Sequence, residues 1–231
     1  MRDIHVTMKV TLISYSQPFL AGSDTSEDSL DNLVAYCARV SNPANQQNTE
    51  TNGKLLRYLS QHQHWSPFEM VSICLEIETT RDIARQILRH RSFSFQEFSQ
   101  RYAVANLGFE QKEARLQDTK NRQNSIEVGQ DDGDDALRSE WSSMQSRVAQ
   151  SAEMAYQWAL DNGIAKEQAR AVLPEGMTVS RMYMNGTLRS WIHYIQLRSG
   201  NGTQKEHRVV ALACAAAIEP IFPTIREFVN P

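Results

Sequence analysis

The segment VSICLEIETTRDIARQILRH (residues 71–90) changes its hydrophobic period halfway along. Its first part, 71–78, alternates apolar and polar side chains, which is the pattern of a strand with one buried face. From residue 80 onward the apolar positions recur with helical spacing, with Thr80 as a possible N-cap and Asp82 in the first turn. The fold must therefore accommodate a strand that leads directly into a helix.

The remaining elements are mostly helical. Residues 4–15 alternate as a further strand, whereas 108–135 carry little apolar periodicity and end in the acidic loop 129–135. Helices are expected at 26–40, 49–63, 139–163, 166–176, 187–198 and 204–222. This order predicts an α+β fold, a mixed and largely antiparallel sheet with flanking helices, rather than repeated βαβ units. We expect a single domain over residues 1–231, in which 108–135 is a variable surface segment.

Composition excludes several classes of protein. The chain has 231 residues, a formal net charge of −3 and three widely spaced cysteines without a CxxC pair. Free thiols of this kind are typical of a reducing compartment, so we expect a cytoplasmic protein. No stretch resembles a signal peptide, and none approaches the roughly 18 apolar residues of a membrane span, so no membrane partner is expected.

Arginine dominates the basic residues. There are 18 arginines and six lysines, and five of the arginines lie between Arg81 and Arg101. The planar guanidinium group binds phosphate or carboxylate through two parallel hydrogen bonds, whereas lysine is the commoner choice on a solvated surface. Because the pI is about 6.1, this bias favours a small anionic ligand over a nucleic acid.

Three of these arginines form a column on the helix that follows residue 80. Arg81, Arg85 and Arg89 stand at i, i+4 and i+8, and like charges at this spacing destabilise a helix by about 0.2–0.5 kcal/mol per pair. The column therefore needs acidic partners or a bound anion. Local acids are one set of candidate partners: Glu76, Glu78 and Asp82. They suit Arg81 better than Arg89, because the tripeptide RHR begins at Arg89 and concentrates more donors there.

A second group of polar residues follows the column. The segment SFSFQEFSQR (92–101) adds Ser94, Glu97, Ser99 and Arg101. Arginine for charge and serine for an adjustable donor is a mixture found in phosphate sites. Ordinary turn hydrogen bonding is the alternative for the two serines. The three phenylalanines of this region are expected in the core: Phe93, Phe95 and Phe98.

The helix expected at 187–198 carries an apolar stripe and a polar stripe. The apolar stripe comprises Leu188, Ile192 and Ile195, and the polar stripe comprises Arg189, His193 and Gln196. Arg198 follows at the helix end, and Arg170 lies in the preceding short helix. Two polar faces on otherwise apolar helices indicate a polar site within the fold, with ordinary solvated faces as the alternative.

Other chemistries have weaker support. His62 and His64 form an HxH pair whose side chains face different ways on a helix, and no acid or cysteine stands at a metal-ligand spacing, so no metal site is expected. Ser99 with a histidine would suit a hydrolase, but no GxSxG elbow is present. Neither GxGxxG nor GxxxxGK[ST] occurs, so neither nucleotide-binding motif applies.

Four separated blocks resemble the flavin-dependent thymidylate synthases, the ThyX family. Arg89-His90-Arg91 followed by seven residues and Ser99 is similar to the signature of that family. The blocks that carry the resemblance are HQHWSPFEM (62–70), ARQILRHRSFSFQEFSQRY (84–102), ARAVLPEG (169–176) and LRSWIHYIQLR (188–198). Together they run from about residue 60 to 210.

The resemblance implies an activity and its partners. It implies a methyltransferase that converts dUMP to dTMP in nucleotide biosynthesis, with 5,10-methylenetetrahydrofolate as carbon donor and NADPH as reductant through bound FAD. It also implies a homotetramer whose active sites lie at subunit interfaces, with no nucleic-acid partner. Since no enzyme serine attacks the uracil in the mechanism favoured for this family, Ser99 becomes a binding residue.

The resemblance further implies roles for individual residues. Arg198 would be catalytic, facing the uracil and favouring ionisation at its N3, while Ser99 and Arg101 would contact the phosphate. The residues implied for dUMP are Gln86, Arg89, Glu97, Ser99, Arg101, Arg170 and Arg198. Those implied for FAD are His64, Ser66, Arg89, His90, Arg91, Glu97, Arg189 and His193.

Three positions depart from the usual family pattern and leave details of flavin and folate contact undefined: Met70, Gln96 and His193. Two other interpretations stay open. One is a flavin enzyme acting on a different pyrimidine nucleotide, and the other is a non-catalytic nucleotide- or RNA-binding protein that uses the same arginines. The low pI and the arginine bias argue against the second.

Overall fold

The computed structural model describes residues 8–18 and 29–230. The strand expected at 4–15 and the helix expected at 26–40 begin outside these ranges, so only their later parts can be compared. There the strand is β1 (Lys9–Tyr15) and the helix is α1 (Leu30–Ala38).

Four strands form one sheet in the order β1-β2-β6-β3. The three strands after β1 are β2 (Ser72–Thr80), β3 (Ser94–Glu97) and β6 (Val179–Thr187). Backbone hydrogen bonds join the end of one strand to the start of its neighbour, from Ser16 N to Ser72 O at 2.9 Å and from Leu188 N to Val71 O at 2.8 Å. Neighbouring strands joined in this way run antiparallel. The predicted α+β class, a largely antiparallel sheet with flanking helices, is confirmed.

Every helix expected from the sequence occurs. Beyond α1 these are α2 (Asn52–Gln61), α3 (Arg81–Ile87), α4 (Asp132–Asp161), α5 (Lys166–Ala169), α6 (Leu188–Ser199) and α7 (Lys205–Ile218). Short 3-10 helices lie at Pro43–Asn45, Ser66–Met70, Arg170–Val172 and Pro223–Phe228, and a small antiparallel hairpin joins β4 (Arg115–Gln117) to β5 (Ser125–Glu127). Within the described part of the chain, no helix is long and apolar enough to cross a membrane.

The contacts divide the chain into two compact units. The sheet unit comprises Lys9–Ile77, His90–Gln96 and Tyr183–Pro231, and the α4 unit comprises chiefly Glu78–Arg89 and Glu97–Met182.

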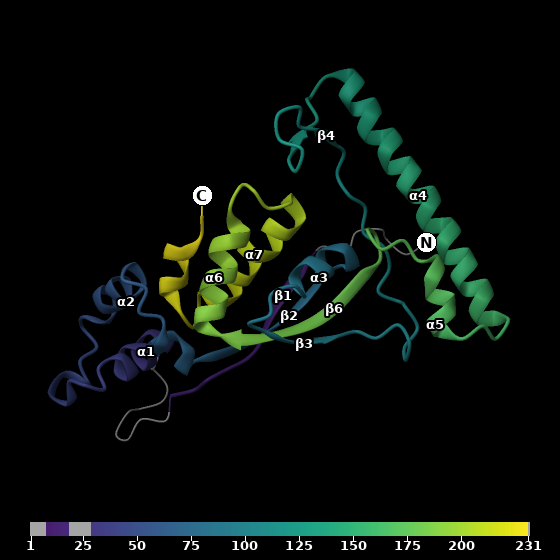
Figure 1. Cartoon of the computed structure of the whole chain (residues 1–231). Coiled ribbons are helices and arrows are strands. Elements are labelled where there is room, and N and C mark those ends of the chain that lie inside the picture. Colours follow the sequence, from purple (N-terminus) through teal and green to yellow (C-terminus); the bar gives the residue numbers. More distant parts are fainter. Residues whose placement is uncertain (1–7, 19–28, 231) are drawn as a thin grey trace. The chain divides into compact units, whose positions relative to one another are not determined.

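In the sheet unit, α6 and α7 lie side by side and α7 packs against β1 (Figure 1). Trp191 of α6 is fully buried, and its Nε1 donates a hydrogen bond to Ile73 O of β2 at 3.0 Å. The predicted apolar stripe of α6 is confirmed, because all three of its side chains are 0% exposed: Leu188, Ile192 and Ile195. The core of this unit therefore fixes α6, which carries several of the predicted site residues.

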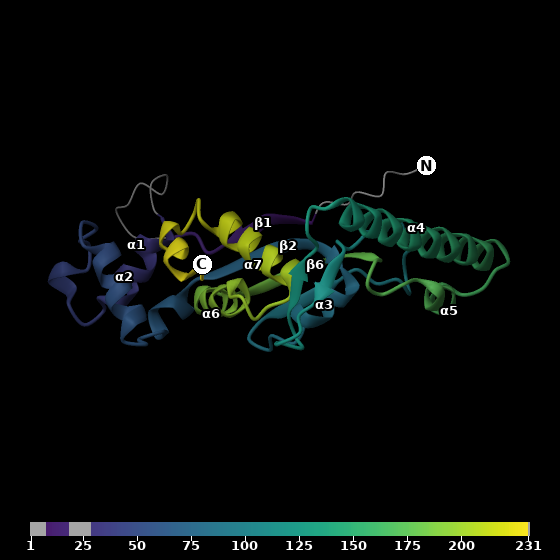
Figure 2. The same cartoon turned by 90° about the horizontal axis from the view of Figure 1, so that it is seen from above.

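In the α4 unit, Figure 2 shows α4 as one long helix with α5 close to it. Tyr156 and Ala159 of α4 pack with Ala169 of α5. Gly163 follows the helix with a φ of 75°, in the left-handed region that glycine adopts without strain. The predicted glycine stop is thus confirmed.

The predicted start of this helix, at 139, is wrong. α4 begins at Asp132, because Asp131 and Asp134 form a capping box in which each side chain accepts a hydrogen bond from the other residue's backbone N–H. Carboxylates are favoured at a helix N-terminus, where they satisfy free N–H groups and the helix dipole. Part of the acidic segment expected as a loop is therefore the cap and first turn of α4.

β6 was not expected from the sequence. Its buried positions include Met182, Met184 and Gly186, which alternate with the more exposed Arg181, Tyr183 and Asn185. This alternation is the period of a strand, so the signal was present. Two methionines and a glycine, which are weak strand formers, obscured it.

Candidate active site

The signature segment (89–101) follows α3 and contains β3. Phe93 anchors it in the sheet unit, where its ring packs edge-on against Trp191 with ring centroids 4.8 Å apart. The same ring covers Gly186, at which any Cβ would collide with it. Phe93 is buried, as predicted, whereas the other two phenylalanines of the segment are only partly buried: Phe95 and Phe98.

The arginine column of α3 meets acids from distant segments. Arg81 Nη1 lies 3.4 Å from Glu97 Oε1, and Arg85 Nη2 donates to Glu175 Oε2 at 3.1 Å. The hydrogen bond from Arg85 also lowers the pKa of the Glu175 carboxyl, which keeps it charged. Glu78, one of the local acids considered as a partner, instead pairs with an arginine of β6 at 2.8 Å. Tertiary contacts, rather than neighbours along the chain, therefore balance the first two arginines of the column.

Arg89 and Arg91 differ from these two arginines. Both side chains are exposed, and neither makes an ion pair or hydrogen bond with any residue in 8–18 or 29–230. Two guanidinium groups without acidic partners, one residue apart in a turn, are suited to an anion with more than one phosphate.

Glu97 is oriented by two side chains of the α4 unit. Its Oε1 accepts a hydrogen bond from Ser180 Oγ at 3.0 Å and faces Arg81. Both contacts engage the same oxygen, so Oε2 has no partner among the described residues. The carboxylate is therefore held in place with one acceptor oxygen available to a ligand. Ser180 was not among the expected site residues, because it lies on the strand that the sequence did not reveal.

Arg101 and Arg170 both contact Glu167, Arg101 at the carboxylate and Arg170 at the backbone carbonyl. Arg101 Nε is 3.4 Å from Glu167 Oε2, and Arg170 Nε donates to Glu167 O at 3.3 Å. The side chain of Ser99, two residues before Arg101, has no hydrogen-bond partner in the described part of the chain. Gln86, on α3, belongs to the same unit and is partly buried.

Arg198 lies on the last turn of α6 in the sheet unit. Its Nε donates a hydrogen bond to His90 Nε2 at 3.0 Å. Arg198 therefore contacts the signature segment, to which His90 belongs. Tyr194, one helical turn earlier, packs edge-on against the ring of His90 with centroids 4.9 Å apart. Neither the hydrogen bond nor the role of Tyr194 could be anticipated from spacing, since His90 and Arg198 are 108 positions apart.

The polar stripe of α6 faces the segment that precedes β2. Arg189 forms a salt bridge with Glu69, and His193 packs edge-on against Trp65 with ring centroids 4.5 Å apart. Burial, together with the positive charge of Arg189, lowers the pKa of His193, so its imidazole is neutral near pH 7. His193 is exposed and the side chain of Arg189 is 42% exposed, so this stripe both contacts the segment before β2 and faces solvent.

His64 and Ser66 lie just before β2 and are exposed. His64 stands in a small group of rings with Tyr58 and His62, at centroid distances of 6.2 and 6.1 Å. Among the described residues no cluster of three or more His, Cys, Asp or Glu could hold a metal ion.

The two predicted ligand sets separate largely by unit. Most residues expected for dUMP lie in the α4 unit: Gln86, Arg89, Glu97, Ser99, Arg101 and Arg170. Most residues expected for FAD lie in the sheet unit: His64, Ser66, His90, Arg91, Arg189 and His193. Arg198 is the exception, since it is expected for the nucleotide and lies in the sheet unit. The signature segment is the stretch of chain that contributes to both.

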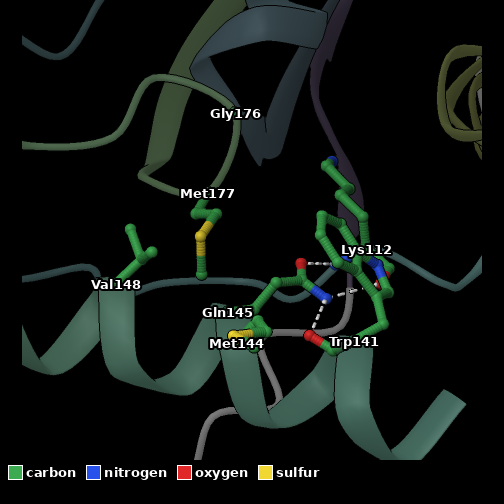
Figure 3. A pocket seen from close by; sticks show the side chains of 7 residues that line it. All are labelled: Lys112, Trp141, Met144, Gln145, Val148, Gly176 and Met177. Atoms are coloured by element: carbon green, nitrogen blue, oxygen red, sulfur yellow. Dashed lines mark hydrogen bonds between the residues drawn. The ribbon is translucent and has the colours of Figure 1, made fainter. Parts of the chain in front are cut away.

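A separate pocket of about 270 Å³ lies in the α4 unit, beside α4 (Figure 3). Its polar groups are already satisfied, because Gln145 Oε1 accepts from Lys112 N at 2.7 Å and both Gln145 Nε2 and Trp141 Nε1 donate to Lys112 O at 2.9 Å. None of the predicted site residues lines it. It is therefore a different feature from the candidate site.

Comparison with known proteins defines the class to which this fold and site belong. Residues 24–224 match the sequence model of the family described as thymidylate synthase complementing protein. The chain is 48% identical over 219 residues to a probable flavin-dependent thymidylate synthase of Paramecium bursaria Chlorella virus 1, and 50% identical over 218 residues to the flavin-dependent thymidylate synthase of Synechocystis. Each alignment covers 94% of this chain and 97% of the relative. This chain belongs to the flavin-dependent thymidylate synthase family.

Solved structures agree with this assignment. The UMP/dUMP methylase PolB from Streptomyces cacaoi, bound with 5-Br dUMP, superposes with a TM-score of 0.79 at 28% identity, covering 97% of this chain and 95% of that one. The same enzyme bound with 5-Br UMP gives a TM-score of 0.80 at 26% identity, covering 98% of both chains.

Proposed function

We propose that this protein is a flavin-dependent thymidylate synthase that converts dUMP to dTMP, with 5,10-methylenetetrahydrofolate as carbon donor and NADPH as reductant through FAD. The observation that supports it most strongly is the identity of about half of all residues with named synthases over 94% of the chain. Residues 24–224, which match the family model, include the signature segment, from which both expected ligand sets draw side chains.

The nucleotide is assigned chiefly to side chains of the α4 unit. Glu97 offers Oε2 as an acceptor for a hydroxyl or amide of dUMP, and Ser99 offers an uncommitted hydroxyl. Arg101, which pairs with the Glu167 carboxylate, and Arg170, which donates to the Glu167 backbone carbonyl, supply positive charge for the phosphate. Gln86 completes the set as a neutral hydrogen-bonding side chain, and Arg89 is available to either ligand.

The residues expected for FAD fit that cofactor. Arg89 and Arg91 are exposed cations without acidic partners among the described residues, which suits a pyrophosphate. In the sheet unit, His193 packs against the ring of Trp65 and Arg189 pairs with Glu69. Bound FAD supplies hydride chemistry that no side chain of this protein can perform. The remaining residues expected for FAD are His64, Ser66, His90 and Glu97.

Arg198 is the proposed catalytic residue. A guanidinium held beside the uracil stabilises the anion formed when N3 loses its proton, and this raises the electron density at the carbon to be alkylated. Arg198 retains Nη1 and Nη2 for this task, since its one hydrogen bond among the described residues uses Nε.

A homotetramer with sites at subunit interfaces is part of the proposal. One face of α4 exposes apolar side chains at i, i+4, i+7 and i+11, namely Leu137, Trp141, Met144 and Val148, each at least 43% exposed. Exposed apolar stripes of this kind mark protein–protein contacts. A cytoplasmic location is consistent with three free cysteines.

The first test is spectroscopic and kinetic. Purified protein should show oxidised flavin absorption, and it should oxidise NADPH faster when dUMP is added, because the nucleotide completes the site. Product analysis should then find dTMP when methylenetetrahydrofolate is present. Protein that stays colourless after reconstitution with FAD, or that forms no dTMP, would overturn the proposal.

A second candidate substrate is UMP, because the structural neighbour PolB is a UMP/dUMP methylase. Identity of 48–50% with dUMP-type synthases, against 28% with PolB, favours dUMP. Binding of dUMP, UMP and CMP can be compared by titration, with CMP as the control for a base that lacks the N3 proton. We expect dUMP to bind most tightly, and equal turnover of UMP and dUMP would assign the PolB-type activity instead.

A further inference from the structure

Arg198 is held by one directional hydrogen bond. The Nε–H of an arginine points along a single direction in the guanidinium plane, so the 3.0 Å bond to His90 Nε2 fixes the rotation of that plane. Nη1 and Nη2 have no partner among residues 8–18 and 29–230 and remain available. Nε therefore sets the orientation of the guanidinium group, whereas Nη1 and Nη2 can bind a ligand.

The bond also fixes the tautomer of His90. Arginine is always protonated and can only donate, so His90 must present a lone pair at Nε2 and carry its hydrogen on Nδ1. In this tautomer Nδ1 is the ring nitrogen that donates.

Buried side chains pack beside the imidazole of His90. Tyr194 is 1% exposed and packs edge-on against the ring of His90, and its hydroxyl lies 3.1 Å from Nε2 of the fully buried His207. The rings of His90 and His207 are 6.3 Å apart. Three segments thus hold His90: its own turn, α6 and α7.

We propose that His90 is a positioning residue for Arg198, and that its neutral Nε2 aligns the guanidinium with the pyrimidine ring. This inference rests on the proposed role of Arg198 in ionising dUMP. It gives His90 a function in the nucleotide chemistry, in addition to the FAD contact implied by the signature.

Two substitutions of similar size distinguish these functions. The amide of glutamine reaches the place of Nε2 and can accept from Arg198, whereas the amide of asparagine reaches only the place of Nδ1. His90→Gln should therefore keep most of the wild-type kcat, and His90→Asn should lower kcat by about 10- to 100-fold, as expected for a misaligned catalytic group. In both variants the Kd for FAD should change much less than kcat. His62→Gln, an exposed histidine outside the proposed site, is the control.

Ionisation of bound dUMP gives a readout that is independent of turnover. The ultraviolet difference spectrum of the dUMP complex can be followed as a function of pH without folate. In His90→Asn the pH of N3 ionisation should rise by about one to two units, which corresponds to the expected 10- to 100-fold loss. In an Arg198→Ala background the same substitution should cause no further rise.

The outcomes are distinct. Rescue by asparagine rather than glutamine, or loss of FAD affinity with unchanged N3 ionisation, would overturn the inference and leave His90 as a cofactor contact only. Wild-type protein that neither ionises bound dUMP nor makes dTMP would instead overturn the proposed function. Equal kcat in both variants and the wild type would overturn the positioning role alone.

Discussion

Replacing Arg198 by alanine is expected to lower kcat by about 10²- to 10³-fold while FAD remains bound, because a fixed donor beside a developing anion contributes on that scale. The side chain stands at the end of α6, where its only described hydrogen bond goes to His90 and leaves two nitrogens free. Among the residues expected to bind FAD, His90 is the one with a described hydrogen bond to Arg198. Loss of activity should therefore exceed loss of cofactor.

The measurement is kcat for dTMP formation together with the ratio of flavin to protein. Arg198→Lys should recover little activity, since lysine keeps the charge but lacks the fork and the Nε donor. Arg226→Ala is the matched control, because Arg226 pairs with Glu219 and its side chain is 75% exposed. Near-normal dTMP formation by Arg198→Ala would show that this arginine is not catalytic.

His207 is expected to make the protein sensitive to acid. Burial, with the nearby positive charge of Arg198 and the neighbouring His90, lowers the pKa of His207 from 6.5 to about 3. In the unfolded chain the imidazole takes up a proton below its ordinary pKa, whereas the folded protein does not. The free energy of unfolding should therefore decrease as the pH falls below about 6.5, at a rate approaching 1.4 kcal/mol per pH unit until about pH 3.

Urea unfolding at several pH values tests this expectation. Between about pH 7.5 and 5 the contribution of His207 should fall by roughly 2 kcal/mol. His207→Gln keeps a hydrogen-bonding partner for Tyr194 but cannot titrate, so its stability should depend less on pH by that amount. His62→Gln, which replaces an exposed histidine, should behave like the wild type. An equally steep fall in His207→Gln would mean that other groups cause the acid sensitivity.

The elements with strong local patterns could be predicted. The ends of β2 and α3 lie within about three residues of the ends expected from the sequence. Alternation and helical spacing predict them well because both patterns reflect burial on one face. The stripe of α6 and the stop at Gly163 follow from the same local rules. The start of α4 was misplaced, since its capping signal lies in a polar segment without apolar periodicity.

The partners of the charged residues could not be predicted. Spacing showed that Arg81 and Arg85 share a face and need acids, yet the acids came from β3 and from the loop before β6. Local charge is a poor guide here, because any of several carboxylates can satisfy a guanidinium. Which one does so depends on where packing brings the segments.

The sequence by itself determined the α+β class, the main helices and the family, because periodicity and motif spacing are properties of consecutive residues. Only the tertiary structure decided that Ser180 and Arg81 orient Glu97, and that His90 orients Arg198. These contacts join residues many positions apart in the sequence. The packing of buried side chains such as Phe93 and Trp191 brings the segments that carry these residues together. Hydrogen bonds of this kind have no local signature, since each partner is an ordinary polar residue until the fold places it.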